Sequence, residues 1–383
     1  MKFFEELGRP DTSIAIMDGP GSSRRSRLGQ HISIGRGRYV LVVGTPGSGK
    51  TAFLDTVFVL NTFLNWKKFG GPKPYIIYRS MERPEKFKLA KWLAYLTFID
   101  KGCIFDVPTI LGLSNKKRDL TPDDISLLKS YEPVLEELLE IVELIPGTAS
   151  PESVYERGTN VARGLGLVVE AQQGKIKVNG QIQGELNQKE VVNGVDRFYS
   201  DMSFGRIYEG KYFFPKTDRT VYHITDHVGK VLKGSRTERE AINAHATIMG
   251  DVFRDIYGFC CFDVLQMNRE IENTYRQVKT ELTIKRSDIK GSSVPEENAD
   301  TILGLLNPLK YDYNNYEGYR ITDMNEGGDN NFRALLGIKN TYGIDDFVLG
   351  LCFYGAMGFI KELPRADEMT GYDYERVKTF NYR

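Results

Sequence analysis

One short segment limits the possible folds of this chain more than any other. It follows the apolar run 39–43, opens an apolar helix, and reads Gly44-Thr45-Pro46-Gly47-Ser48-Gly49-Lys50-Thr51. Glycines in such a segment let successive backbone N–H groups turn inward around an anion, and the following helix directs its positive end at the same point. The pattern G-x-x-x-x-G-K-[ST] in this context predicts a nucleoside triphosphate site, with Lys50 on the phosphates and the Thr51 hydroxyl on Mg²⁺. The alternative is a glycine-rich turn without a ligand.

Composition narrows the class of protein. The chain has 383 residues, of which 41% are hydrophobic, enough for one large domain with embellishments. Its 51 basic and 51 acidic residues balance, so any contact with DNA must come from local patches. Cys103, Cys260, Cys261 and Cys352 form no C-x-x-C pair and are expected to be reduced. No apolar run reaches the roughly 18 to 20 residues that span a bilayer, so we expect a cytoplasmic protein without membrane contact.

The chain from residue 39 onward alternates apolar strands with amphipathic helices. This pattern predicts an α/β fold with a mostly parallel twisted sheet and helices on both faces. Helices are expected after Lys50, from Pro84, and from an N-cap at Thr121 to about Leu139. The expected strands are 39–43, 75–78, 140–145, 221–225, 259–265, 301–306, 332–338 and 347–353.

Three regions depart from this alternation. Residues 1–37 are polar and contain several arginines, which favours an arm that is either a solvated tail or a subunit-binding segment. Within the main domain, 38–364, the stretch 167–218 is read as an insertion with a β-hairpin around an Asn-Gly turn at 179–180. Residues 365–383 form a polar, tyrosine-rich tail that is expected either to fray or to pack on a neighbour.

Two acidic residues end predicted strands. Asp226 follows the run 221–225 and is the candidate for the Mg²⁺ side, although such a residue is often a turn or N-cap residue. Glu82 follows the strand 75–78 and is the candidate general base for the attacking water. Its alternative is a first-turn glutamate that favours the helix dipole.

The order and spacing of several motifs carry a family resemblance that covers nearly the whole chain beyond Arg36. The motifs are residues 44–51, Ser80-Met81-Glu82, His223-Ile224-Thr225-Asp226-His227, Gln266-Met267-Asn268-Arg269 and Ser287-Asp288-Ile289-Lys290-Gly291-Ser292. Together they resemble the RecA-like motor domain of DnaB-type replicative DNA helicases, particularly compact phage versions. The resemblance implies a homohexameric ring around single-stranded DNA that translocates by hydrolysing ATP at subunit interfaces. A primase or a helicase loader is the further partner that such a family implies.

Transferred position by position, the resemblance assigns roles. Lys50 and Thr51 match the phosphate and Mg²⁺ ligands, Glu82 the catalytic glutamate, Asp226 the second acidic motif, and Gln266 the sensor that reports the γ-phosphate toward DNA. Gln266 suits this role because a strand-end amide hydrogen-bonds phosphate or water, although it is also read as a plain polar cap. Two loops would then face the channel and grip the DNA backbone. Their candidate residues are Lys233, Arg236, Arg239, Arg269, Lys285, Arg286 and Lys290.

The segment Lys339-Asn340-Thr341-Tyr342-Gly343 departs from the family. The family normally has Lys-Asn-Arg here, and the arginine stabilises transition-state charge on the neighbouring subunit's ATP. Thr341 stands at that position. Lys339 is the candidate catalytic cation in trans, although an ammonium does not reproduce the bidentate guanidinium, and Arg333 or Arg320 are possible substitutes. Weak or partner-dependent ATP hydrolysis is one consequence that this substitution allows.

Three functions remain open from the sequence. The preferred one is an ATP-driven, ring-forming replicative DNA helicase. The second is a RecA-like DNA-binding ATPase, a recombinase or a loader, without unwinding activity. The third, motivated by Thr341 alone, is a nucleotide-binding scaffold without hydrolysis.

Overall fold

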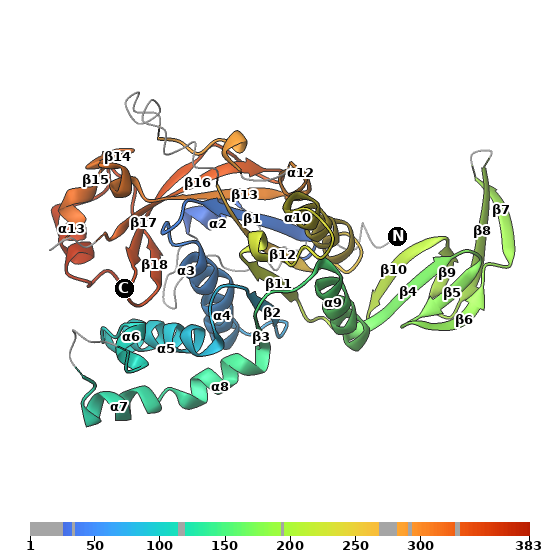
Figure 1. The fold of residues 1–383 in the computed structure, drawn as a ribbon, viewed down its shortest axis with the longest axis horizontal. Helices are drawn as coiled ribbons and strands as arrows, with labels where there is room; N and C mark the ends of the chain where they lie inside the picture. Colours follow the sequence, from blue (N-terminus) through green and yellow to red (C-terminus); the bar gives the residue numbers. More distant parts are fainter. Residues whose placement is uncertain are drawn as a thin grey trace.

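The fold is built on one large sheet (Figure 1). The computed structural model of the protein describes residues 26–32, 35–113, 119–192, 195–267, 282–289, 293–325 and 330–383. The strands of the large sheet are β1 (Arg38–Gly44), β2 (Tyr75–Ser80), β3 (Val142–Pro146), β11 (Val221–Asp226), β12 (Cys260–Gln266), β13 (Thr301–Leu306), β16 (Phe332–Asn340), β17 (Val348–Tyr354) and β18 (Phe359–Glu362). They form a nine-stranded sheet in the order β18-β17-β16-β13-β1-β12-β11-β2-β3.

The sheet is mostly parallel. The strands from β13 to β3 run parallel to one another, and β16, β17 and β18 are added antiparallel. The central strands are buried along nearly their whole length, which explains why they read as apolar runs rather than as alternating patterns. Each segment predicted as a strand contributes to this sheet, so the predicted α/β class with a mostly parallel sheet is confirmed. Strand β18 was not predicted.

One face of the sheet is covered by the helix that follows the glycine-rich loop. It begins as α3 (Lys50–Leu54), passes through the π-helical turn η1 (Asp55–Leu60) and continues as α4 (Asn61–Phe69). The ring of Phe58 stacks on Phe262 of β12 with centroids 4.2 Å apart. The predicted deep burial of this helix is therefore observed.

The other face is covered by α9 (Pro151–Leu165), α10 (Glu238–Thr247) and the π-helical turn η3 (Ile248–Arg254). Phe253 of η3 packs against His223 of β11, with ring centroids 5.0 Å apart. Helices therefore lie on both faces, as the alternation of the sequence predicted.

The predicted helix from Thr121 to Leu139 is wrong in one respect, because it is two helices. They are α7 (Pro122–Lys129), capped by Thr121, and α8 (Glu132–Ile141). Pro133 lacks the N–H that would donate to the carbonyl oxygen of Lys129 in one continuous helix, so the chain breaks between them. The predicted strand 140–145 consequently starts two residues later, at Val142.

Residues 166–192 and 195–215 form a separate pair of small antiparallel sheets that projects from the body beyond α9 (Figure 1). The predicted hairpin is present, and its turn residues Asn179 and Gly180 both have positive φ, as such turns require. A small apolar cluster that includes Val169, Ile176 and Ile207 holds this region together. The strands are β4 (Gly166–Gln172), β5 (Lys175–Val178), β6 (Gln181–Glu185), β7 (Gln188–Val192), β8 (Val195–Met202), β9 (Gly205–Tyr208) and β10 (Gly210–Pro215).

Both described ends of the chain pack on the body of the protein. Helix α2 (Arg27–His31) is held by an ion pair of 2.8 Å between Arg27 and Glu362. At the other end, Tyr382 is buried after α13 (Gly371–Lys378), so the tail packs on its own core rather than fraying. The remaining elements are α5 (Glu85–Lys101), α6 (Val107–Ile110), η2 (Val228–Lys230), η5 (Arg286–Asp288), α12 (Val294–Asn298), η6 (Pro308–Tyr311), β14 (Asn315–Tyr316), β15 (Tyr319–Arg320) and η7 (Ile321–Met324).

The structure also bears on the predictions about the cysteines and about membrane-spanning helices. All four cysteines are free, and Cys260, Cys261 and Cys352 are buried. Among the described residues, no helix combines the length and the apolar character needed to cross a bilayer.

His223 makes the stability of this fold dependent on pH. Its side chain is fully buried on β11, and neither ring nitrogen has a hydrogen-bond partner among the described residues. Burial lowers the pKa of His223 well below its ordinary value of 6.5, and Arg79 and His245 add repulsion. Between pH 6.5 and the lowered pKa, His223 is protonated in the unfolded chain but neutral in the folded chain. Stability should therefore fall as the pH falls, by about 1.4 kcal/mol per pH unit for this group.

The substitution His223→Phe tests this prediction, because phenylalanine fills the same site beside Phe253. Urea unfolding of the variant should show a smaller loss of stability between neutral and mildly acidic pH than wild type. His31→Gln is the control: burial also lowers the pKa of His31, but His31 is only partly buried, so this variant should keep most of the wild-type pH dependence. Equal pH dependence in His223→Phe and wild type would contradict the prediction.

Candidate functional site

The strand register brings four predicted site segments to one edge of the sheet. Gly44 of β1 pairs with Gln266 of β12, and Asp226 of β11 pairs with Ser80 of β2. Glu82 follows Ser80 by two residues. Because carboxyl ends of neighbouring parallel strands form one edge, the glycine-rich loop (44–51), both acids and the glutamine emerge together there.

The glycine-rich loop needs its glycines for space and for backbone conformation. Gly49 has φ of 96° and directly precedes α3, a left-handed conformation that other residues rarely adopt. A Cβ on Gly44 would lie 2.4 Å from the carbonyl oxygen of Leu305. Any side chain at Gly44 would therefore displace the loop from β13.

Lys50 is buried inside this loop, with 6% of its surface exposed. Its Nζ donates hydrogen bonds to the carbonyl oxygens of Gly44 at 2.8 Å and Thr45 at 2.9 Å. Burial lowers the pKa of Lys50 to about 8, against the attraction of Asp226 and Glu82. The loop thus holds a desolvated cation that an anionic ligand would stabilise.

Thr51 and Asp226 meet at the start of α3. The Thr51 hydroxyl donates to Asp226 Oδ1 at 2.9 Å, and Asp226 is fully buried. Thr45 Oγ1 and Ser48 Oγ are buried without a hydrogen-bond partner in the described part of the chain. A hydroxyl, a carboxylate and unpartnered hydroxyls in the loop fit a phosphate group and Mg²⁺, which prefers oxygen ligands and keeps several waters.

Glu82 lies at the mouth of the site, with 34% of its side chain exposed. His227 Nε2 is 3.3 Å from Glu82 Oε1. Burial lowers the pKa of His227, and the Glu82 carboxylate opposes this effect. His227 has φ of 86°, which is uncommon for a residue with a side chain and costs conformational energy. Helix α5 starts only at Glu85, so the alternative role of Glu82 as a first-turn helix glutamate is wrong.

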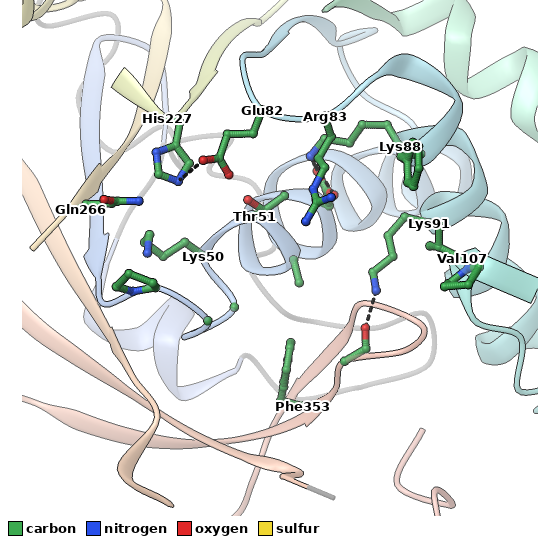
Figure 2. Close-up of a pocket in the computed structure, with 18 residues that line it drawn as sticks. Lys50, Thr51, Glu82, Arg83, Lys88, Lys91, Val107, His227, Gln266 and Phe353 are labelled. Carbon is green, nitrogen blue, oxygen red and sulfur yellow. Dashed lines mark hydrogen bonds and ion pairs between the residues drawn. The ribbon is translucent and has the colours of Figure 1, made fainter. Parts of the chain in front are cut away.

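These residues surround a cleft of about 600 Å³ (Figure 2). Lys50, Glu82, His227 and Gln266 lie at one end, and Lys91, Val107 and Phe353 lie toward the other. The full lining is Pro46, Gly47, Gly49, Lys50, Thr51, Ala52, Asp55, Glu82, Arg83, Phe87, Lys88, Lys91, Val107, Pro108, His227, Gln266, Phe353 and Gly355.

The Phe353 ring forms an aromatic wall of the cleft beside the glycine-rich loop, 3.1 Å from where a Cβ on Gly49 would lie. The guanidinium of Arg333 lies 4.2 Å from the centroid of the Phe353 ring, and its Nε donates to the Ser48 carbonyl oxygen at 3.0 Å. Burial lowers the pKa of Arg333 to about 9. On the opposite side, Lys91 donates to the carbonyl oxygens of Gly355 and Ala356. Sequence reasoning did not select Phe353 or Lys91.

Asp55 and Lys88 also line the cleft and were not predicted. The signal for them was available in the sequence. Asp55 is a charged residue inside the apolar run 53–60, and Lys88 precedes Trp92 by one helical turn on the buried stripe of α5. A single acid in one buried helix and a single base in another are expected to pair.

The two predicted DNA-contacting loops leave the same edge of the sheet, because they follow the adjacent strands β11 and β12. Lys233 and Arg236 are exposed in the first loop, where Arg236 forms an ion pair of 2.5 Å with Glu152, and Arg239 is exposed in the first turn of α10. Lys285 and Arg286 are exposed near the end of the second loop. Arg269 and Lys290 lie outside the described residues.

Lys339 lies at the opposite edge of the sheet from the glycine-rich loop. It pairs with Ile302 near the beginning of β13, and its Nζ donates to the carbonyl oxygens of Glu296 at 2.9 Å and Glu297 at 3.1 Å. It is therefore remote from the cleft of its own chain and caps α12. Arg320 pairs with Asp323 at 3.2 Å and does not line the cleft. Of the three cations considered in place of an arginine finger, only Arg333 contacts the loop 44–51 within one chain.

Comparison with known proteins gives matches in structure only. No protein-family model matches the chain, and no curated protein matches it in sequence. Among solved structures, a DnaB-like replicative helicase, described with its interactions with primase, has a TM-score of 0.60 at 15% identity, over 95% of this chain and 65% of that chain. A second solved structure, the isolated ATPase domain of a helicase, has a TM-score of 0.61 at 14% identity, over 95% of this chain and 96% of that chain. The chain therefore has the RecA-like fold of DnaB-type helicase motor domains, and it spans 65% of the length of the first match.

Proposed function

We propose that this protein is an ATP-dependent, ring-forming DNA helicase that translocates on single-stranded DNA during replication. One observation carries the proposal. The glycine-rich loop, Asp226, Glu82 and Gln266 share one edge of the sheet with exposed basic residues that follow β11. This arrangement connects a site for hydrolysis with a surface for a polyanion.

The proposed chemistry assigns each polar group a task. The ammonium of Lys50 neutralises charge on the phosphates as the bond to the leaving group breaks. Bound Mg²⁺, held by the Thr51 hydroxyl and through Asp226, would supply further charge neutralisation. Glu82 accepts the proton of the attacking water, and its contact with His227 keeps its carboxylate at the mouth of the cleft.

The base and ribose of the nucleotide are assigned to the end of the cleft that contains Phe353. Its ring is backed by the Arg333 guanidinium and gives a flat surface on which a base can stack. The Ser48 carbonyl accepts from Arg333, so the same side chain also fixes the glycine-rich loop. Lys50 and Phe353 both line this cleft, so one cleft offers a cation for the phosphates and a ring for the base.

The ring is proposed because Lys339 has no access to the cleft of its own chain. In a closed ring, the edge that carries Lys339 would face the cleft of the neighbouring subunit. Lys339 would have to leave the carbonyl oxygens of Glu296 and Glu297 to act there. With Thr341 in place of an arginine, we expect basal ATP hydrolysis to be slow.

The proposal predicts that single-stranded DNA accelerates ATP hydrolysis several-fold and that the protein unwinds a forked duplex. Replacing Lys233, Arg236 and Arg239 together by alanine should weaken DNA binding at all sequences alike. The slope of log affinity against log salt should decrease by about 0.7 per lost phosphate contact, or about 2 in total. Hydrolysis without DNA should remain at the wild-type level, because these residues do not line the cleft.

Three measurements separate the alternatives. Electron microscopy with an ATP analogue should show closed six-membered rings, whereas open helical filaments would favour a recombinase-like ATPase. DNA-stimulated hydrolysis without unwinding would favour a loader. Tight nucleotide binding without phosphate release, with and without DNA, would contradict an enzymatic role and leave a binding scaffold.

A further inference from the structure

Two oppositely charged side chains from buried helical segments meet directly behind Thr51. Lys88 Nζ lies 2.9 Å from Asp55 Oδ1 and 3.1 Å from Oδ2. The side chains are 2% and 4% exposed, respectively. Asp55 belongs to η1 and Lys88 to α5, so the pair connects the helix that follows the glycine-rich loop with the helix that follows Glu82.

The same ammonium reaches the acid of the candidate metal site. Lys88 Nζ lies 3.2 Å from Asp226 Oδ2, and it also donates to the hydroxyl of Tyr78. Tyr78 in turn donates to Asp226 Oδ2 at 3.3 Å. The other oxygen, Oδ1, accepts from Thr51 at 2.9 Å. Each oxygen of Asp226 therefore has its own donors, and the carboxylate has one orientation.

Stability alone is a poor explanation for this cluster. Burying an ammonium between two carboxylates has a desolvation cost that the mutual attraction only partly offsets, and apolar residues of similar volume often stabilise a core equally well. The cluster instead fixes the orientation of the Asp226 carboxylate. With Lys88 and Tyr78 on Oδ2, rotation of the carboxylate away from Thr51 would break two contacts.

We propose that Lys88 is a positioning residue that holds Asp226 with Oδ1 toward Thr51, in the orientation that receives Mg²⁺ together with a nucleotide. Asp55 keeps the ammonium at this point. The inference rests on the proposed function, because it requires that the cleft binds a nucleotide with Mg²⁺. Outer groups that orient a metal's ligands typically change metal affinity by about 10- to 100-fold when removed.

The test measures binding rather than turnover. Affinity for a fluorescent ATP analogue is measured without Mg²⁺ and across a Mg²⁺ titration, for wild type and Lys88→Met. We expect the Mg²⁺ concentration at half-saturation to rise about 10-fold or more in the variant. Metal-free affinity should stay within about two-fold, because Lys50 and the loop carry the phosphate contacts. A residue with a purely structural role would lower thermal stability without moving the Mg²⁺ dependence.

The double variant Asp55→Asn with Lys88→Met covers the case in which Lys88→Met folds poorly. It removes both members of the pair, so no extra buried carboxylate is left uncompensated beside Asp226. We expect its thermal stability to recover relative to the single variant, while the raised Mg²⁺ requirement persists. If the double variant has the wild-type Mg²⁺ requirement, Lys88 does not position Asp226, and its role is to balance the charge of Asp55.

Lys361→Met is the matched control, because Lys361 is a partly buried lysine that lies on β18 beside Tyr382 and does not line the cleft. Its Mg²⁺ requirement should equal that of wild type. An unchanged requirement in Lys88→Met, with normal Mg²⁺-dependent binding in wild type, would overturn this inference alone. If wild type shows no Mg²⁺-dependent nucleotide binding, the proposed function fails, and the inference fails with it.

Discussion

Lys50→Ala should abolish ATP hydrolysis and, with it, unwinding of a forked duplex. The ammonium is held 2.8 Å and 2.9 Å from the carbonyl oxygens of Gly44 and Thr45, inside the loop that we expect to surround the phosphates. Removing one preorganised charged donor from such a site typically costs about 100- to 1,000-fold in kcat. A coupled phosphate-release assay with and without single-stranded DNA measures this loss.

The variant has a clear control. Lys73→Ala removes a lysine outside the cleft, where it forms an ion pair of 3.1 Å with Glu140, and should leave hydrolysis unchanged. Circular dichroism should show the native helix content in both variants, because neither lysine belongs to the apolar core. Substantial DNA-stimulated hydrolysis in Lys50→Ala would mean that the chemistry occurs at another site.

Much of the candidate site was predictable because its signals are local. A glycine-rich loop between a strand and a helix is readable from eight consecutive residues. Asp226 ends β11 and Glu82 follows the end of β2 by two residues, and parallel strands bring their carboxyl ends to one edge whatever their order in the sheet. The observed contact between Thr51 and Asp226 is therefore a consequence of strand pattern and parallel pairing.

The contacts that orient these groups were not predictable in the same way. Lys88 meets Asp55 across 33 positions and Asp226 across 138 positions, and only the packing of α5 against η1 brings them together. The role of Lys339 in trans was assigned from its neighbours in sequence, and its place away from the cleft of its own chain depends on the antiparallel return of β16. Short elements such as β18 have too few residues for a pattern.

Glu82→Gln should separate nucleotide binding from hydrolysis. The amide keeps the shape of the side chain and a hydrogen-bonding oxygen beside His227, whose Nε2 lies 3.3 Å away, but it does not accept a proton from water. A positioned general base contributes about 100- to 10,000-fold, so kcat should fall by that factor. Affinity for an ATP analogue should change by less than about three-fold, because Glu82 does not belong to the loop that holds the phosphates.

Glu85→Gln distinguishes this role from a simple charge effect near a helix start. Glu85 is the glutamate in the first turn of α5, three residues after Glu82, and it does not line the cleft. Its loss should cost about 0.3 to 1 kcal/mol of stability through the helix dipole and leave kcat unchanged. If both variants lose activity equally, hydrolysis depends on negative charge near the start of α5 and not on a general base at Glu82. If Glu82→Gln retains most of its kcat, the attacking water is activated elsewhere, and the contact between Glu82 and His227 serves to hold β2 and β11 at the mouth of the cleft.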